Sequence, residues 1–301
     1  MGSGDATAFR ILTDVIGADA EDGNDGDYEG PDGMLCCGVC HEPKEHIFRL
    51  PAHMQAYVPE GTGTEIKRPR ECRCQRDLRM LEERERAERE HTNVVKAMRA
   101  ACFQDAKLAE CTFSVDDRRD AKLSDTCSRY ADKWVDMRDR NIGALLWGEV
   151  GGGKTFYAAC IANALVEREI AVKFRNLPDL AARMSSDYGE GRGAVLEEVR
   201  RIPLLILDDL GFERTTPTGL ENAFTIINTR YDSGKPLIVT TNLTPDEIKS
   251  PANLVHRRAL DRIVELCPIV LQVKGGRRRE IANNKRLEAL EILYGGGQNG
   301  S

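Results

Sequence analysis

The chain has 301 residues, of which 43 are Lys or Arg and 49 are Asp or Glu, so its formal net charge is −6. At roughly 100 to 200 residues per domain, this length allows one large domain or two smaller ones. With 41% hydrophobic and 31% charged residues, the composition excludes a membrane protein and a chain that is disordered throughout. No segment approaches the roughly 20 apolar residues of a membrane span, and residues 1–10 lack the pattern of a signal peptide. We therefore expect a soluble cytoplasmic protein without a membrane partner.

The acidic residues are concentrated at the N-terminus. Residues 1–33 contain nine acidic residues and one basic residue, Arg10. Such a segment buries too little apolar surface to offset its chain entropy, which predicts a disordered acidic leader over residues 1–33. Without these residues the chain has 42 basic and 40 acidic residues, and residues 256–286 alone have nine basic and three acidic ones. The net negative charge therefore does not exclude a nucleic-acid partner, which needs a positive surface.

Five of the ten cysteines fall in two close clusters, CCGVC at residues 36–40 and CRC at residues 72–74. In a reducing compartment, clustered cysteines indicate metal ligands rather than disulfides. The pairs Cys37–Cys40 and Cys72–Cys74 supply the four thiolates of a structural Zn²⁺ site, which predicts a zinc-binding domain over residues 34–76. Unpaired buried cysteines are the alternative, but they would leave this segment without a core. The spacing also allows another ligand in place of one thiolate: Cys36, His41, His46 or His53.

A charged segment without Gly or Pro follows, from Gln75 to Ala109. It predicts a long helix, and we assign residues 77–110 to a linker helix. Charge runs are usually solvated, so a linker is favoured over a specific partner site.

Beyond Arg140, apolar runs alternate with segments of helical length. Strands that are apolar on both faces and separated by helices indicate a parallel sheet covered by helices on each side. We therefore predict an α/β fold with a five-stranded parallel sheet, in a domain over residues 111–293 that is followed by a flexible tail over residues 294–301. The predicted strands are residues 142–147, 170–174, 203–210, 235–242 and 268–273.

The first predicted strand leads into GEVGGGKT at residues 148–155, which fits the phosphate-binding pattern G-x-x-x-x-G-K-[ST] and opens a predicted helix. The glycines allow backbone N–H groups and the helix N-terminus to point at a β-phosphate. Lys154 is expected to reach the β- and γ-phosphates, and Thr155 to place its hydroxyl on Mg²⁺. The predicted nucleotide-binding residues are Gly148, Glu149, Val150, Gly151, Gly152, Gly153, Lys154, Thr155 and Phe156.

Polar residues also end two later predicted strands. Asp208 and Asp209 follow the apolar run LLIL, and Asn242 follows the run LIVTT. We expect Asp208 to hold the Mg²⁺ shell and Asp209 to direct a carboxylate at the water that attacks the γ-phosphate. Asn242 would orient that water or contact the γ-phosphate, because ligands of parallel sheets lie at the carboxyl ends of the strands. Capping of the next helix is the alternative role for the two acids.

Two arginines, Arg258 and Arg262, lie four residues apart and on one face of a predicted helix. They can reach the γ-phosphate bound by a neighbouring subunit as arginine fingers, or pair with Asp261 and Glu265 on their own helix. The spacing alone does not separate these interpretations.

In this order, the segments ALLWGEVGGGKT, LLILDDLG, IVTTNL and RRALDRI resemble the AAA+ ATPases of the DnaC/DnaI replicative-helicase loader family and the related IstB-type transposition helper ATPases. The resemblance covers residues 111–290 and implies a P-loop AAA+ ATPase that uses ATP and Mg²⁺. The roles that it implies are Walker A for Lys154 and Thr155, Walker B for Asp208 and Asp209, sensor 1 for Asn242, and arginine finger for Arg258 with Arg262 as a second candidate.

The resemblance further implies that a segment after the second strand, Lys173 to Arg183, contacts single-stranded DNA, and Phe174 can stack on a base. In the alternative interpretation, Phe174 is a core residue of the strand. Members of the loader family often carry a cysteine-rich N-terminal domain that contacts the helicase. This similarity favours a loader over a transposition helper.

The implied function is an ATP-dependent loader that binds a hexameric replicative DNA helicase through its residues up to 110 and places it on single-stranded DNA. A finger from the next subunit implies a homo-oligomer in the ATP state. The first alternative is an IstB-like transposition helper ATPase that acts on DNA with a transposase. A P-loop small-molecule kinase and a protein that uses the nucleotide only as a structural switch are two others. The expected cofactors are ATP, Mg²⁺ and Zn²⁺.

Overall fold

The computed structural model describes residues 26–55, 64–185, 191–211, 216–250, 254–275 and 277–294. The chain divides into an N-terminal unit, Met1–Glu90, and a C-terminal unit, His91–Ser301. Residues 1–25 of the predicted leader and residues 295–301 of the predicted tail lie outside the described residues. Among the described helices, none combines the length and the apolarity that a membrane span requires.

The N-terminal unit contains two small antiparallel sheets. Strand β1 (Tyr28–Glu29) pairs with β2 (Leu35–Cys36), and β3 (Glu45–Arg49) pairs with β4 (Glu65–Pro69), with the short helix α2 (Ala52–Gln55) after β3. Asp27 forms an ion pair of 2.5 Å with the buried Lys44. Within the segment predicted as a disordered leader, residues 26–33 therefore include β1 and one partner of this ion pair.

The boundary between the two units lies within helix α3 (Arg73–Cys102). Of the residues 77–110 assigned to a linker helix, α3 covers those up to Cys102, and a separate 3-10 helix, η1 (Ala106–Glu110), follows. Val95, Cys102 and Phe103 are buried in a core of the C-terminal unit. The last turns of α3 are therefore part of the C-terminal unit rather than a solvated linker.

A five-stranded parallel sheet forms the centre of the C-terminal unit, as predicted. Its order is β6 (Val172–Asn176), β7 (Leu204–Leu210), β8 (Leu237–Thr241), β5 (Ala144–Trp147) and β9 (Ile269–Gln272). Each of the five predicted apolar segments contains one of these strands. The order places the carboxyl ends of β7, β8 and β5 side by side, which brings together the polar residues that follow them.

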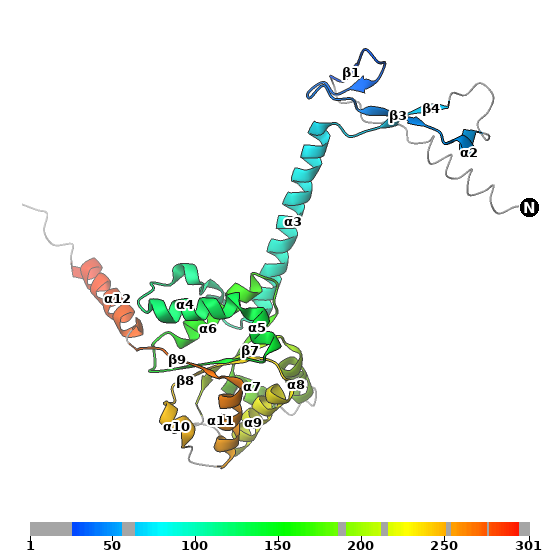
Figure 1. Ribbon diagram of the computed structural model, residues 1–301. Helices are drawn as coiled ribbons and strands as arrows, with labels where there is room; N and C mark the ends of the chain where they lie inside the picture. The colour runs from blue at the N-terminus through cyan, green and yellow to red at the C-terminus, as the bar shows by residue number, and fades with distance from the viewer. Residues whose placement is uncertain are drawn as a thin grey trace, which may run out of the picture. The chain divides into compact units, whose positions relative to one another are not determined.

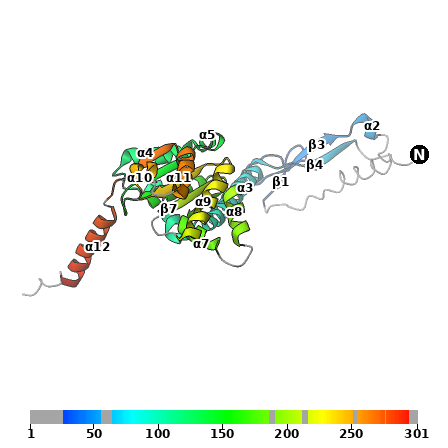
Figure 2. The same ribbon diagram turned by 90° about the horizontal axis from the view of Figure 1, so that it is seen from below.

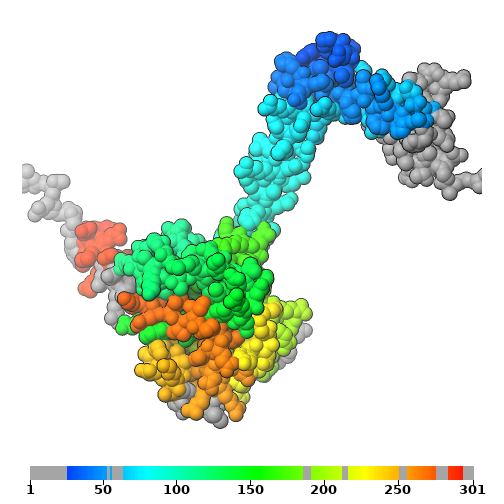
Figure 3. All heavy atoms as spheres, viewed as in Figure 1, coloured from blue at the N-terminus to red at the C-terminus, as the bar shows by residue number. Residues whose placement is uncertain are grey.

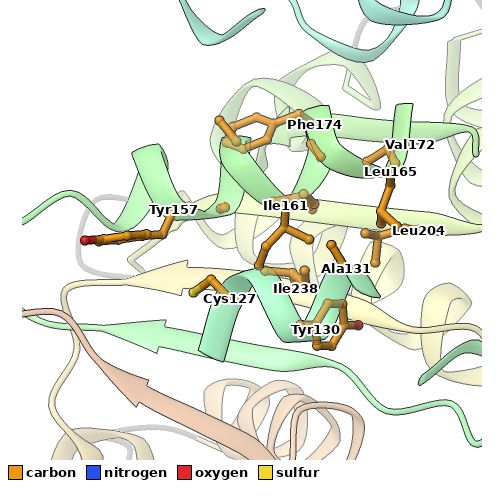
Figure 4. Close-up of a cluster of buried hydrophobic side chains, with 14 of the residues drawn as sticks. Cys127, Tyr130, Ala131, Tyr157, Ile161, Leu165, Val172, Phe174, Leu204 and Ile238 are labelled. Atoms are coloured by element: carbon orange, nitrogen blue, oxygen red, sulfur yellow. The ribbon is translucent and has the colours of Figure 1, made fainter. Parts of the chain in front are cut away.

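Helices cover both faces of the sheet (Figure 1). Helices α4 (Ala121–Asp132) and α6 (Lys154–Val166) pack on one face, and Figure 4 shows Cys127 and Tyr130 of α4 and Ile161 of α6 gathered with Ile238 of β8. The view in Figure 2 shows the helices of the other face. They are α7 (Leu177–Arg183), α8 (Gly191–Arg201), α9 (Pro217–Asp232), α10 (Pro245–Lys249) and α11 (Leu254–Leu266).

Strand β9 lies at the edge of the sheet, and Val270 remains exposed there. Figure 3 shows β9 in orange at the surface, below the green atoms of α4. Two further helices complete the order of elements, α5 (Trp134–Asp139) after α4 and α12 (Arg277–Tyr294) after β9, together with the 3-10 helix η2 (Phe113–Val115).

A fully buried arginine, Arg230 of α9, fastens the amino ends of β7 and β8 to α8 and α9. Its guanidinium donates to four backbone carbonyls, which belong to Val199, Ile202, Pro203 and Pro236. Burial lowers the pKa of Arg230 to about 9, so that the side chain is still charged at neutral pH. The five N–H donors of its planar guanidinium allow one side chain to satisfy all four of these carbonyls.

Arg230→Met is expected to lower the free energy of unfolding by about 3 kcal/mol or more, because it leaves buried carbonyls without donors. For a unit of this size that loss corresponds to a fall in the melting temperature of about 6 to 12 °C. Calorimetry of the full chain measures it. Arg200→Met is the matched control, since Arg200 is exposed and, in the part of the chain that the structure describes, pairs with Glu197 alone, and we expect a change within about 0.5 kcal/mol. Equal melting temperatures for the two variants would contradict the role of Arg230.

Candidate nucleotide-binding site

The loop between β5 and α6 has the backbone of a phosphate-binding loop. Gly148 has a φ of 150°, and a Cβ at this position would lie 2.1 Å from the carbonyl oxygen of Val273. Gly153 caps the N-terminus of α6 in the left-handed region, with a φ of 107°. These two positions require glycine because a side chain would be strained or would clash. A glycine-rich turn that leads directly into the N-terminus of α6 suits an anion.

A cavity of about 560 Å³ lies at the carboxyl ends of the strands. It brings together most of the residues that the sequence assigned to the nucleotide. Gly148 and Glu149 do not line this cavity, but their carbonyl oxygens accept hydrogen bonds from Lys154, which does. Gly152 lines a second cavity, of about 410 Å³. The lining of the first cavity is Leu108, Cys111, Val150, Gly151, Gly153, Lys154, Thr155, Phe156, Asn176, Asp208, Asp209, Thr240 and Asn242.

Lys154 lies at the base of this cavity and bends back over its own loop. Its Nζ donates to the carbonyl oxygens of Gly148 at 2.9 Å and Glu149 at 2.8 Å, and to Oδ1 of Asn242 at 2.7 Å. Burial lowers the pKa of Lys154, while Asp208 and Asp209 act in the opposite direction. The ammonium group is thus held by acceptors that a phosphate can replace.

Asp208 at the end of β7 lies among hydroxyl donors. Thr155 donates to its Oδ1 at 3.0 Å, and Thr240 donates to the same oxygen at 2.5 Å. Burial raises the pKa of Asp208, and the two hydroxyl hydrogen bonds lower it. A hydroxyl and a carboxylate oxygen in contact are the hard ligands that Mg²⁺ takes together with phosphate oxygens. The residues present therefore fit Mg²⁺, which Thr155 and Asp208 would hold.

Asp209 follows in an unusual backbone conformation. Its φ is 60°, which non-glycine residues rarely adopt, and the β7–β8 register shifts between Leu207 and Leu210. The bulge is held by the Asp209 N–H, which donates to Oγ1 of Thr240 at 3.0 Å. Nδ2 of Asn242 lies 3.4 Å from Oδ1 of Asp209. The strained backbone thus sets the two consecutive carboxylates in different places, Asp208 beside Thr155 and Asp209 beside Asn242.

Four residues of the site were not identified from the sequence. Thr240 bridges Asp208 and Asp209, and its signal is the Thr-Thr-Asn end of a predicted strand. Asn176 follows β6 at the same edge of the sheet. Leu108 and Cys111 precede the predicted ATPase domain or begin it, and no local pattern connects them with a nucleotide.

The two candidate fingers lie on α11, and neither lines the nucleotide cavity. The guanidinium of Arg262 stacks on the ring of Tyr231 in the same chain, with its Cζ 4.4 Å from the ring centre. Arg258 is exposed. The structure thus separates the two arginines that the spacing left equivalent.

The segment expected to contact single-stranded DNA is largely committed to the fold. Phe174 is buried and packs on Phe103, with ring centres 5.7 Å apart. Arg175 is buried and pairs with Glu198, and Lys173 donates to the carbonyl oxygen of Ala101. The expectation that Phe174 stacks on a base is wrong, because its ring fills the core, as the alternative interpretation held.

In the N-terminal unit, the sulfur atoms of Cys37, Cys40, Cys72 and Cys74 all lie within 4.8 Å of one another. All four are free thiols. A tetrahedral Zn²⁺ with bonds of about 2.3 Å spaces its sulfurs about 3.8 Å apart, so the donor set fits zinc. Backbone N–H groups of Cys74 and Glu42 lower the pKa of the Cys40 thiol to about 6.

The other ligands that the spacing allowed do not join this group. The Cys36 thiol points to the carbonyl oxygen of Met34 at 3.6 Å. His41 lies against Tyr28, and His46 is on β3. Neither histidine belongs to the group of metal-ligating side chains found among the described residues, and the side chain of His53 lies outside them.

The sequence model of the family described as IstB-like ATP binding protein matches residues 60–286. An insertion-sequence ATP-binding protein of Mycobacterium tuberculosis is 30% identical over 197 residues, covering 62% of this chain and 74% of that protein. The replicative helicase loader DnaI of Bacillus subtilis is 26% identical over 229 residues, covering 74% of this chain and 69% of the loader.

A crystal structure of DnaI has the same fold, with a TM-score of 0.50 and 21% identity over 60% of this chain and 98% of that one. The fold, the phosphate-binding loop and the family match agree, and the family match spans well over half of the sequence. The chain belongs to the IstB-like ATP-binding protein family, whose relatives include the helicase loaders DnaI and DnaC.

Proposed function

We propose that this protein is an ATPase that loads a hexameric replicative DNA helicase onto single-stranded DNA. The proposal has two parts, the hydrolysis of ATP in the cavity at the sheet edge and the delivery of a helicase. The first part rests on the geometry of the cavity. The second rests on the N-terminal unit and on the relatives.

Hydrolysis of ATP requires positive charge around the phosphates, an oriented water and a general base or positioning carboxylate. Lys154 would exchange its contacts with Gly148, Glu149 and Asn242 for phosphate oxygens. This exchange would free Asn242, which lies 3.4 Å from the Asp209 carboxylate, to hold the attacking water or the γ-phosphate. Asp209 would accept a proton from that water, and the Thr240 hydroxyl would keep the two carboxylates apart.

Thr155 and Asp208 would hold Mg²⁺, which neutralises charge on the β- and γ-phosphates when bound. Both side chains already contact each other at 3.0 Å, so they need no large movement to share a ligand. Gly153 and the N-terminus of α6 would direct backbone N–H groups at the β-phosphate.

The loader assignment depends on the four-cysteine group ahead of the ATPase unit. The resemblance to loaders with a cysteine-rich N-terminal domain assigns that unit to contact with a helicase. The similarity to DnaI also extends over more of this chain than the similarity to the insertion-sequence protein, 74% against 62%. The second candidate, a transposition helper, is favoured by the higher identity to that protein, 30% against 26%.

Affinity capture from extract of the native cell, with and without ATP, tests the assignment. A loader retains the replicative helicase, and mass spectrometry identifies it among the captured proteins. The Lys154→Ala variant serves as the matched control bait, because the substitution removes the expected phosphate contact and leaves the N-terminal unit unchanged. Capture of a transposase, or stable filaments on double-stranded DNA without affinity for the helicase, would instead establish the transposition helper.

We further propose that Arg258 completes the ATP site of a neighbouring subunit. Arg258 is exposed on α11, whereas Arg262 is stacked on Tyr231 of its own chain. An exposed guanidinium with no task in its own cavity is the form that a trans-acting finger takes. This assignment requires an oligomer in the ATP state.

Mixing Arg258→Ala protein with Lys154→Ala protein is expected to restore ATPase activity that neither variant has alone. In a random equimolar mixture, about a quarter of the sites combine an intact Lys154 with an Arg258 from the next subunit. Steady-state phosphate release measures the recovery, and Arg262→Ala is the control that should retain activity alone. If both variants assemble and the mixture stays inactive, Arg258 does not act in trans.

A further inference from the structure

A buried amide on α6 has no role in phosphate binding. Asn163 is 1% exposed, and it stands in a helix whose other buried residues are nearly all apolar. Its Nδ2 donates to the carbonyl oxygens of Leu108 and Cys111, each at 2.8 Å, and to that of Ala159 at 3.0 Å. A buried amide costs free energy unless such bonds are made, so these contacts define what the side chain holds.

The carbonyl groups that Asn163 holds belong to the wall of the nucleotide cavity. Leu108 and Cys111 line the same cavity as Lys154 and Asp208. The segment between them is the C-terminal part of η1. Asp105 caps the N-terminus of η1 by accepting a hydrogen bond from the N–H of Lys107. Two of the bonds that position this wall therefore come from a single side chain of the phosphate-binding helix.

The oxygen of the same amide is bonded to the end of α3. Nε of Arg99 donates to Oδ1 of Asn163 at 3.1 Å, and the Arg99 guanidinium also pairs with Glu167 at 2.6 Å. The last carbonyls of α3 are bonded to β6, where Lys173 donates to Ala101 and Arg175 donates to Cys102. The last turn of α3, the wall and α6 thus share one hydrogen-bond network.

We propose that Asn163 is a positioning residue that couples nucleotide occupancy to the last turn of α3, through the wall segment Leu108–Cys111 that its amide holds. This inference rests on the proposed binding of ATP in the cavity. ATP that packs against Leu108 and Cys111 restricts the wall, and the wall bonds of Asn163 restrict Arg99. The coupling is reciprocal, because an ordered end of α3 also favours the wall position that binds ATP.

Amide hydrogen exchange of the full chain, read by mass spectrometry with and without a slowly hydrolysed ATP analogue, tests the coupling. In the native chain, the analogue is expected to slow exchange of peptides from residues 95–111 by about 5-fold or more, the usual range of such coupling. Asn163→Asp keeps the shape and the acceptor for Arg99 but places a carboxylate oxygen against the three carbonyls of Leu108, Cys111 and Ala159. We expect this variant to lose the slowing and to bind the analogue about 5-fold more weakly.

Two further variants separate coupling from a general loss of structure. Arg99→Met alters a side chain that does not line the cavity, and the variant should still bind the analogue while the slowing in residues 95–102 is lost. Asn228→Asp is the matched control, because Asn228 is half-buried and, among the described contacts, its side chain is bonded to Asp232 and not to the wall or α3, and it should behave as the native chain.

The outcomes distinguish the inference from the function on which it rests. A native chain that binds the analogue without any change in residues 95–111 would overturn the coupling and leave the ATP site intact. The same holds if Arg99→Met retains the full slowing in residues 95–102. A native chain that does not bind the analogue would overturn both.

Discussion

Removal of zinc by a chelator is expected to unfold the N-terminal unit while the C-terminal unit keeps its structure. The described part of the N-terminal unit buries few apolar side chains, namely Cys36, Cys37, Leu50 and Cys72, and its sheets have only two strands each. Two-stranded sheets without a core are marginal in water, so we propose that metal binding at the four cysteines supplies the stability. In zinc-finger peptides this contribution is on the order of 10 kcal/mol.

Metal analysis and amide hydrogen exchange check this result. We expect one zinc per chain, and loss of exchange protection in β3 and β4 after chelation. Cys72→Ser should lose the metal. Its effect on metal affinity should exceed the roughly 10- to 100-fold loss that follows removal of a residue hydrogen-bonded to a ligand. Cys36→Ser is the matched control, because Cys36 is equally a buried cysteine but lies outside the group of four. Protected β3 and β4 amides in the chelated protein would show that the unit folds without metal.

Asp209→Asn is expected to abolish ATP hydrolysis while ATP binding persists, and Lys154→Ala is expected to weaken both. Asp209 contacts Asn242 and Thr240 but not the loop, so its amide variant should keep the phosphate contacts and lose the proton acceptor. General base catalysis contributes on the order of 100- to 10,000-fold, which sets the expected fall in rate. The positive charge of Lys154 stabilises the phosphates both in bound ATP and during transfer. Its loss should therefore raise the dissociation constant for ATP as well as lower the hydrolysis rate.

Single-turnover hydrolysis and binding of a fluorescent ATP analogue separate the two effects. Asp232→Asn is a suitable control, because Asp232 is exposed at the end of α9 and bonded to Asn228, away from the cavity. An unchanged hydrolysis rate in Asp209→Asn would remove Asp209 from the mechanism. Binding without hydrolysis in the native chain would instead support the interpretation in which the nucleotide is a structural switch.

Features that depend on residues close together in the chain were predictable. The phosphate-binding loop is a contiguous pattern whose glycines meet a backbone requirement, and the parallel strands are continuous apolar runs because both of their faces are buried. The two cysteine pairs were predictable for the same reason, since the two members of each pair are close together in the chain. Four thiolates are also the ligand number that a structural Zn²⁺ takes. These patterns led to the fold and to the core of the candidate site, and the observed sheet agrees with them.

Features that depend on packing between distant segments were not predictable. The sequence assigned Phe174 to DNA as one interpretation, but its ring packs on Phe103, which is 71 positions earlier and directly follows α3. The sequence does not distinguish Arg258 from Arg262 as the arginine finger, because both lie on the same face of one helix. Only the structure shows that the Arg262 guanidinium stacks on Tyr231 of α9. The surroundings of a side chain depend on which other element packs against it. The spacing of residues within one helix does not tell which element that is.

The sequence by itself determined the class of the molecule: a parallel α/β sheet, a loop for phosphates, acids at the next strand end and four paired cysteines. Those properties follow from backbone conformation, apolar periodicity and ligand number, which are local. The tertiary structure alone decided that Thr240 joins the Asp208 carboxylate to the Asp209 backbone, that Leu108 and Cys111 line the cavity, and that Asn163 bonds both this wall and Arg99 of α3. Each of these is a contact across tens of residues, created only when the helices and strands pack.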